Sequence, residues 1–499
     1  MSTPKGIEFE PGFFPGHPRG LPTLFFTEMW ERFSYYGMRA LLTLYLTGVT
    51  IGTNPGLGFD VVTAGAIYGL YTSFVYLLAL PGGWVADQLW GQRKAVFVGG
   101  CIIAAGHFSM AIPTQFTFFQ GLVLIVIGTG LLKPNVSAVV ADLYPEGGAR
   151  RDAGFSIFYM GINVGAMLGP FLCGLLGEGY NWHLGFSLAG IGMVAGLIQF
   201  RLGYRNLGNA GLLRTDRTPE EVARTGRTFF GTCTALAVAL VAFGLLVSNG
   251  TIPVGLAGIA EYMTYGILGI MGVYFLYVLF WGGHDSEERK KVVVIFWLFL
   301  LAALFWSGFE QAGTSLSLFA RDFTDRTIGS WEFPASWFAW VNALFIIVLA
   351  PVFAWFWVWL ANRQANPSVP MKFALGLLGL AAGFFVIAWG AANATPDAPA
   401  SASWLVVMYF LHTVGELALS PVGLSAMTKL APRTRVGQMM GVWFVAAALG
   451  NLIAGRVAGR LEGLEPSPLF GSVAWIILGG GLVAVIVSPF MKRLMGDVK

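Results

Sequence analysis

The chain has 499 residues, of which 56% are hydrophobic and only 11% are charged. Soluble globular proteins carry about 25% charged residues, so this composition excludes an ordinary soluble domain and indicates a membrane protein that crosses the bilayer many times. The formal net charge of +4 is small and gives no indication of a nucleic-acid partner.

Apolar runs of about 20 residues, long enough to cross a bilayer, recur along the chain between short polar breaks. They predict about fourteen transmembrane helices, at 22–48, 62–86, 95–112, 116–141, 153–176, 184–204, 229–247, 257–281, 291–320, 334–361, 370–391, 402–429, 436–459 and 470–494. The protein is therefore expected to be all-α and polytopic.

Lysine and arginine gather in alternate loops. Basic residues follow the second, fourth, sixth and eighth predicted helices, whereas no Lys or Arg occurs in the loops 49–61, 113–115, 177–183, 248–256 and 392–401. The loops 321–333 and 460–469 carry mixed charge and dilute this pattern. Positive charge marks the cytoplasmic side, which predicts a multi-pass plasma (inner) membrane protein with both termini in the cytoplasm.

The long polar segment after the sixth helix divides the chain into four predicted parts. Residues 1–204 form an N-terminal six-helix bundle, and residues 205–228 form a cytoplasmic Arg-rich linker. Residues 229–281 form an inserted transmembrane hairpin, and residues 282–499 form a C-terminal six-helix bundle. Glu261 is the only formal charge in the two hairpin spans, so we expect a lipid-facing spacer. Transporters built from two such bundles hold their substrate near the midplane between them.

A polar stripe follows one face of the first predicted span, formed by Glu28, Glu31, Arg32, Tyr35, Tyr36 and Arg39. These residues recur at helical spacing, so their side chains share one face. A charge that faces lipid is expensive, so this face must contact protein or a water-filled pathway. The pair formed by Glu28 and Arg32, one turn apart, also has a purely structural interpretation.

The other ionisable groups inside predicted spans are few and central. Lys133 lies in the fourth span beside Pro134, Glu310 in the ninth and Glu416 in the twelfth. Two neutral polar residues, Asn163 and Asn342, lie in the fifth and tenth spans. Intramembrane ionisable groups usually mark a functional site. His412, one turn before Glu416, is interpreted as a packed histidine.

The two predicted bundles offer opposite charges, which suits a zwitterion. Arg32, Arg39 and Lys133 supply cations from the first bundle, and Glu310 and Glu416 supply anions from the second. If a substrate carboxylate takes Arg39 from Glu310, the unpaired Glu310 binds a proton more readily, which couples the two ligands reciprocally. Amphipathic walls are expected from a set of aromatic residues, Tyr35, Tyr36, Tyr76, Trp306 and Trp443. The sequence contains no motif for ATP hydrolysis or proteolysis.

Four motifs in chain order resemble those of the proton-dependent oligopeptide transporter family of the major facilitator superfamily. The segment Glu28–Arg39 is similar to the family's ExxER signature and its extension, and Phe158–Gly165 resembles its fifth-helix motif. The segment Gly415–Gly423 resembles its tenth core helix. Gly83–Arg93 resembles the superfamily loop signature, with the one extra residue between Asp87 and Gly91 that peptide transporters show.

This resemblance implies a role for each candidate residue. Glu28, Glu31 and Arg32 would form a proton-linked cluster near Lys133. Arg39 and Lys133 would bind the peptide carboxylate, with Glu310 as the protonatable partner of Arg39. The remaining residues would bind the amine (Glu416, Asn163, Asn342) or line side-chain pockets (Tyr36, Tyr76, Trp306, Trp443, Ser420). The chain has no histidine on its second helix, unlike the mammalian members, which leaves the proton route on carboxylates.

The sequence thus predicts the major facilitator fold, two six-helix bundles with an inserted hairpin, and the function of a proton-coupled symporter for di- and tripeptides. The expected partners are peptides, protons and the lipid bilayer; no enzymatic activity, cofactor, metal or nucleic acid is expected, and a monomer is expected to function. Two alternatives remain open: a transporter of this fold for another small anion, such as nitrate or a conjugated metabolite, and a peptide sensor that does not transport.

Overall fold

The computed structural model describes residues 13–213, 215, 217–432, 435–462 and 465–496, and most of these are helical. The first seven long segments are α1 (Gly20–Thr47), α2 (Val61–Leu77) continued by α3 (Ala79–Val85) and η1 (Ala86–Trp90), α4 (Gln92–Met110), α5 (Gln115–Asp142), α6 (Gly148–Gly179), α7 (Trp182–Leu202) with η2 (Gly203–Leu207), and α8 (Pro219–Ser248).

The remaining seven segments are α9 (Leu256–Trp281), α10 (Ser286–Phe309) continued by η3 (Glu310–Gly313) and α11 (Ser315–Asp322), α12 (Phe338–Asn362) after η4 (Ala335–Trp337), α13 (Val369–Gly390), α14 (Ser403–Leu430), α15 (Val436–Gly459) with η5 (Arg460–Glu462), and α16 (Pro466–Met495). Among the described residues, 12 helices are long and apolar enough to cross a membrane. With α1 and α4 they match the fourteen predicted segments, so the all-α polytopic prediction is confirmed.

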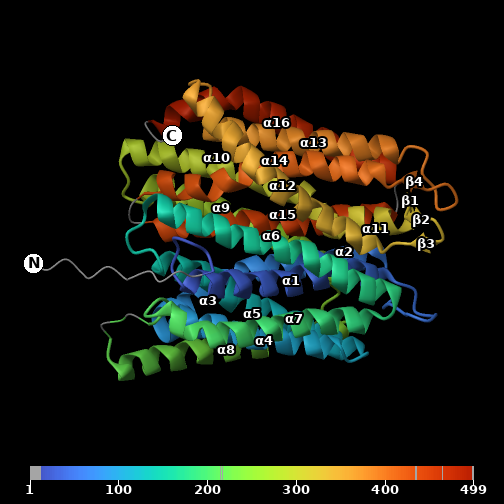
Figure 1. The fold of residues 1–499 in the computed structure, drawn as a ribbon, viewed down its shortest axis with the longest axis horizontal. Coiled ribbons are helices and arrows are strands. Elements are labelled where there is room, and N and C mark those ends of the chain that lie inside the picture. Colours follow the sequence, from blue (N-terminus) through green and yellow to red (C-terminus); the bar gives the residue numbers. More distant parts are fainter. Residues whose placement is uncertain (1–12, 214, 216, 433–434, 463–464, 497–499) are drawn as a thin grey trace, which may run out of the picture. The chain divides into compact units, whose positions relative to one another are not determined.

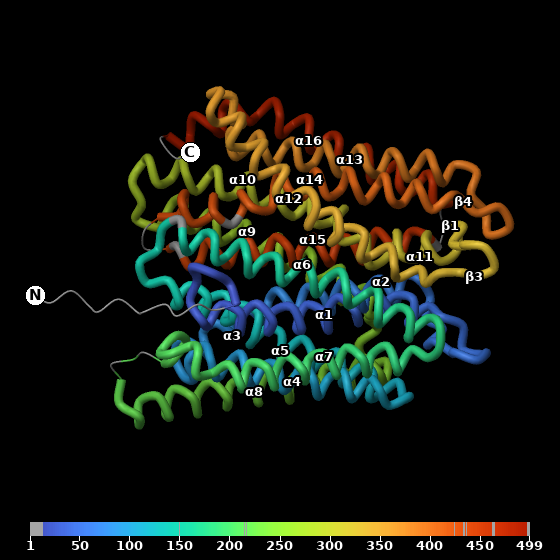
Figure 2. The backbone as a smooth tube through the Cα atoms, in the orientation of Figure 1, coloured from blue at the N-terminus to red at the C-terminus, as the bar shows by residue number. Residues whose placement is uncertain are grey.

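Contacts between Cα atoms divide the chain into two compact units. Unit 1 holds α1 as far as Met38, residues Leu78–Cys173 and residues His183–Pro253. Inside it α4 packs along α5, and α3 packs on α5 (Figure 2). Glycine permits this closeness, because a Cβ added to Gly82 would lie 1.9 Å from the carbonyl oxygen of Gly130. Small residues at such crossings let helix backbones approach one another in membranes.

Unit 2 holds Arg39–Leu77, Gly174–Trp182 and the chain from Val254 onward. Helix α13 lies beside both α14 and α16, and α15 packs against α2 and α10 (Figure 1). Among the described residues, four two-residue strands pair outside the helices: β1 (Thr324–Asp325) runs parallel to β4 (Ala400–Ser401), and β2 (Thr327–Ile328) runs antiparallel to β3 (Trp331–Glu332). The first ladder connects the loop after α11 with the loop before α14, and the second lies within the loop after α11.

The inserted hairpin begins earlier than predicted. Helix α8 starts at Pro219, ten residues before the predicted start at 229, so the last part of the predicted linker 205–228 is helical. The reason is a capping box: Thr218 accepts a hydrogen bond from the Glu221 amide, and the Glu221 carboxylate accepts one from the Thr218 amide. Helix α8 has no buried residue, as a lipid-facing helix requires. The division into four parts stays a prediction.

Candidate functional site

The acidic residues at the start of the α1 stripe are buried in unit 1 and paired with Arg32. Glu28, Glu31 and Arg32 are at most 3% exposed. The Arg32 Nε lies 3.2 Å from Glu28 Oε1 and also donates to Glu31. The guanidinium lies over the rings of Tyr35 and Tyr36, with centroid distances of 5.1 and 5.8 Å. A buried charge is tolerated only with such partners, so the cluster is preorganised by its own helix.

Helix α6 brings its backbone against the α1 stripe through glycines spaced four apart. A Cβ at Gly165 would lie 2.2 Å from the carbonyl oxygen of Met29 and 2.9 Å from the Arg32 Cβ. A Cβ at Gly169 would lie 2.4 Å from the carbonyl oxygen of Phe33. Only glycine permits this close approach, so these two positions determine where the charged side chains of α1 lie relative to α6.

Unit 1 also holds three further predicted residues, Tyr36, Lys133 and Asn163. Lys133 lies on α5 beside Pro134 and interacts electrostatically with Glu28. The Asn163 amide donates to the Tyr159 carbonyl one turn earlier at 2.9 Å. The structure therefore brings Lys133 to the acidic cluster, while the Nδ2 of Asn163 is engaged by its own helix.

Arg39 and Glu310 form a buried ion pair in unit 2. Their side chains are 11% and 3% exposed. Arg39 Nε also donates to the Tyr68 hydroxyl at 2.5 Å. Glu310 begins η3, where the long segment predicted at 291–320 breaks between α10 and α11. The break presents Gly313 to Tyr68, and a Cβ there would lie 2.0 Å from the Tyr68 hydroxyl oxygen.

Glu416 on α14 is held by the neutral amide of Asn342. Asn342 Nδ2 donates to Glu416 Oε2 at 3.0 Å and to Thr413 Oγ1 at 2.9 Å. Glu416 and Glu310 interact electrostatically. Unit 2 therefore brings a cation, Arg39, and two carboxylates into one electrostatic neighbourhood. This arrangement can neutralise both ends of a small zwitterion.

The predicted wall residues of unit 2 have different environments. Trp443 is 8% exposed and packs against α14, where a Cβ at Gly423 would lie 2.1 Å from the indole. Within the described part of the chain, Trp306 Nε1 and Ser420 Oγ are buried without a hydrogen-bond partner. Tyr76 is half-buried on α2. Unsatisfied buried polar atoms need an explanation, and a bound polar substrate would supply one.

Tyr68 and Thr413 were missed by the sequence reasoning. A tyrosine in an apolar helix usually finds a hydrogen-bond partner for its hydroxyl. Tyr68, within the apolar segment 61–77, was therefore a candidate for a polar contact inside the protein. Thr413 precedes Glu416 by three residues and lies on the same helix face, and this spacing could have indicated that the two residues share a polar site. His412 is packed, as expected: it is 1% exposed and its ring lies 4.9 Å from the ring of Phe384.

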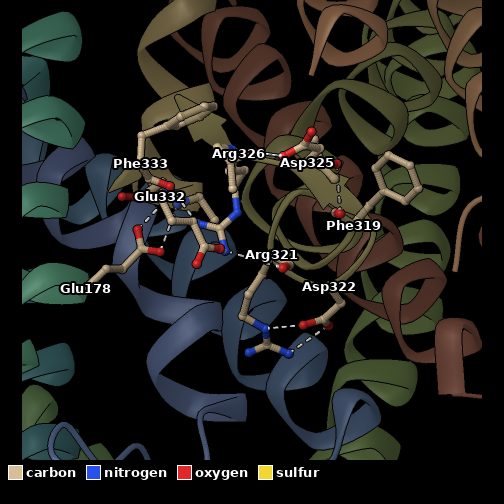
Figure 3. A network of polar contacts seen from close by, with 12 residues as sticks. Glu178, Phe319, Arg321, Asp322, Asp325, Arg326, Glu332 and Phe333 are labelled. Carbon is tan, nitrogen blue, oxygen red and sulfur yellow. Dashed lines mark hydrogen bonds and ion pairs between the residues drawn. The ribbon is translucent and has the colours of Figure 1, made fainter. Parts of the chain in front are cut away.

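A second polar network, absent from the predictions, lies at loops predicted to be extracellular (Figure 3). Glu178 at the end of α6 accepts hydrogen bonds from the amides of Ala335 and Ser336, at 2.9 and 2.8 Å. These amides open η4 just before α12, so Glu178 caps that segment from a distant part of the chain. Figure 3 also shows the Arg321 guanidinium against the Asp322 carboxylate.

The end of α1 is tied to the same region by hydroxyl groups. Arg321 Nη1 donates to Thr47 Oγ1 at 2.7 Å, and Thr43 Oγ1 donates to the Gly313 carbonyl at 2.6 Å. Two helices of the predicted N-terminal bundle, α1 and α6, therefore bond to the segment between α10 and α12. No group of three or more His, Cys, Asp or Glu suited to a metal occurs in the described residues.

Comparisons with known proteins agree on one family. The family model described as "POT family" matches residues 93–476. The chain is 42% identical to the peptide transporter YePEPT of Yersinia enterocolitica, covering 97% of both chains, and 39% identical to a di-/tripeptide transporter of Lactococcus lactis, covering 97% of this chain and 98% of the relative.

The chain is also 42% identical to an uncharacterized transporter, YclF, of Bacillus subtilis, covering 98% of this chain and 96% of the relative. A crystal structure of the peptide transporter POT with sulfate superposes with a TM-score of 0.88 at 41% identity, covering 97% of both chains. The predicted major facilitator fold is confirmed by this likeness.

Proposed function

This chain belongs to the POT family, as the family match over residues 93–476 shows, and we propose that it is a proton-coupled symporter that imports di- and tripeptides by alternating access between two helical bundles. It is an integral multi-pass membrane protein and a peptide transporter of that family. The two relatives named for peptide transport, at 42% and 39% identity, support the substrate class. We further propose that it lies in the inner membrane with both termini in the cytoplasm.

The observation that supports this function best is the neighbourhood of Arg39, Glu310 and Glu416. A peptide carries a carboxylate and an ammonium group, and Arg39 offers a bidentate donor for the first while Glu416 offers an acceptor for the second. Asn342 holds Glu416 at 3.0 Å, so its carboxylate is oriented before substrate arrives. A simple anion such as nitrate would leave Glu416 without a role.

Proton coupling follows from competition for Arg39. In the absence of peptide Arg39 neutralises the buried Glu310. When the peptide carboxylate binds Arg39, Glu310 loses its cation, and an unpaired buried carboxylate is costly in its charged form. Glu310 then takes a proton, which travels with the peptide. Glu28, Glu31 and Arg32 form the second proton-linked cluster in this proposal, with Lys133 as their neighbour and a further ligand of the carboxylate.

In this proposal the remaining predicted residues contact the amine or the side chains of the peptide. Asn163 supports recognition of the amine. Five side chains line the pockets for the peptide's own side chains, namely Tyr36, Tyr76, Trp306, Trp443 and Ser420. The unpartnered polar atoms of Trp306 and Ser420 support this role, because a peptide amide can pair with each.

The network around Glu178 supports alternating access. It joins α6 to the segment just before α12, and it joins α1 to α11, so two helices of the predicted N-terminal bundle bond to the predicted C-terminal bundle. The Glu178 end of this network lies in the loop 177–183, which lacks Lys and Arg, as expected of the side that faces outward. They would hold that side closed while the substrate leaves toward the cytoplasm.

A labelled dipeptide in proteoliposomes tests the proposal against its rivals. We expect an inward proton gradient to accelerate uptake, and we expect unlabelled dialanine, but not nitrate, to compete. Competition by nitrate alone would favour the anion transporter. Saturable binding of dipeptide without any uptake would favour the sensor, and either result would overturn the symporter.

A further inference from the structure

A second basic site lies where α13 begins and α14 ends. A pocket of about 270 Å³ opens there, and the residues that line it include Lys372, Lys429, Ser425 and Asn366. None of the residues lining it is acidic. The two lysines repel one another electrostatically. The pocket therefore concentrates positive charge.

The start of α13 adds to that charge. Lys372 stands in the first turn of this 22-residue helix, which holds no acidic residue. The N-terminus of a helix carries partial positive charge, so a lysine there is unfavourable unless an anion is present. The N-cap Ser368 makes no side-chain cap bond, and its hydroxyl lies 3.3 Å from that of Ser488. The first turn of α13 thus offers an anion partial positive charge and the nearby hydroxyl of Ser368.

Tryptophans beside the basic residues indicate that this pocket lies at the depth of lipid headgroups. The ammonium of Lys372 lies 4.4 Å from the ring centroid of Trp357, and the guanidinium of Arg363 lies 4.0 Å from that of Trp359. Tryptophan paired with a basic residue is typical of the membrane–water interface. The basic loops predict that this end faces the cytoplasm, where anionic lipids attract Lys and Arg.

We propose that this pocket binds a phosphate group, with Lys372, Lys429 and the first turn of α13 as its ligands. Either of two sources would present this chemistry: the headgroup of an anionic phospholipid in the cytoplasmic leaflet, or free phosphate from the cytoplasm. Ser425, on the rim, adds a hydroxyl donor. The site is separate from the Arg39–Glu310 pair and does not depend on what is transported.

Thermal unfolding of the full-length protein in neutral detergent tests this site. Phosphatidylglycerol, phosphatidylcholine and inorganic phosphate are each titrated, because a ligand that binds the folded state raises the unfolding temperature with its concentration. A rise with phosphatidylglycerol alone identifies a lipid site, and an equal rise with inorganic phosphate identifies a free anion. No rise with either overturns the proposal.

The double variant Lys372→Gln/Lys429→Gln should weaken the apparent affinity for the stabilising phosphate by roughly 30-fold. This factor follows because each basic residue contributes about 1 kcal/mol of binding free energy. The matched control Lys291→Gln/Arg493→Gln removes the same charge outside the pocket and should keep wild-type affinity. Equal loss in both variants, or retention in the first, contradicts the site. If the first variant does not fold, Ser425→Glu places a negative charge on the rim and should give the same loss.

Discussion

Replacing Glu310 with glutamine separates proton transport from peptide binding. The carboxylate is 3% exposed and pairs with Arg39, whose Nε also holds the Tyr68 hydroxyl at 2.5 Å. Glutamine keeps a carbonyl acceptor for Arg39 but cannot take a proton. One proton moved down 100 mV yields about 2.3 kcal/mol, which sustains roughly a 50-fold peptide gradient. The variant should therefore exchange peptide across the membrane but accumulate it to a ratio near one.

Two assays in the same proteoliposomes make that comparison. Counterflow with peptide on both sides measures exchange, and uptake under an imposed membrane potential measures accumulation. Asp397→Asn is the matched control, because Asp397 is exposed and its change removes one carboxylate without touching the pair. If Glu310→Gln still concentrates peptide like this control, Glu310 does not carry the coupled proton.

Three further predictions concern the residues that position these charges. Tyr68→Phe removes the hydroxyl group that accepts a hydrogen bond from Arg39. Because a lost hydrogen bond to a charged group costs about 1.5–3 kcal/mol, the peptide KM should rise at least tenfold in uptake assays. An unchanged KM would show that this hydrogen bond does not contribute to peptide binding. Glu178→Ala leaves the amides of Ala335 and Ser336 without their acceptor, so distances between spin labels on the loops proposed to be extracellular should lengthen, whereas Glu178→Gln should largely retain the wild-type distances. Identical distances in all three proteins would argue against a role of Glu178 in holding that side closed. Gly165→Ala forces a Cβ against the Met29 carbonyl and should lower the free energy of unfolding by about 1–3 kcal/mol, measured by thermal unfolding. The control Gly266→Ala, at a position with open space around it, should not lower it. Equal effects of the two variants would refute the packing argument.

The helices and most of the charged site were predictable because both depend on local spacing. A run of apolar residues long enough for a bilayer predicts a helix without any tertiary knowledge, and Glu28, Glu31 and Arg32 pair within one helix. The family resemblance assigned both Asn342 and Glu416 to the peptide amine, and in the structure Asn342 Nδ2 lies 3.0 Å from Glu416 Oε2.

Features that depend on distant segments were not predictable. The start of α8 was misplaced because the apolar run starts after the capping box at Thr218, so hydropathy alone points too far along the chain. Glu178 capping the amides before α12 requires two segments separated by more than 150 residues to meet. The break at Glu310 lies inside a continuous apolar run, where composition gives no sign that η3 interrupts the helix.

The most direct test of coupling is the charge that accompanies a neutral peptide. Dialanine carries no net charge at neutral pH, so any current that it induces must come from the coupled ion. Protein-containing membranes on a solid support should show an inward current when dialanine is added without an imposed gradient, and Glu310→Gln should abolish that current. Dialanine uptake with no current in the wild-type protein would contradict proton symport.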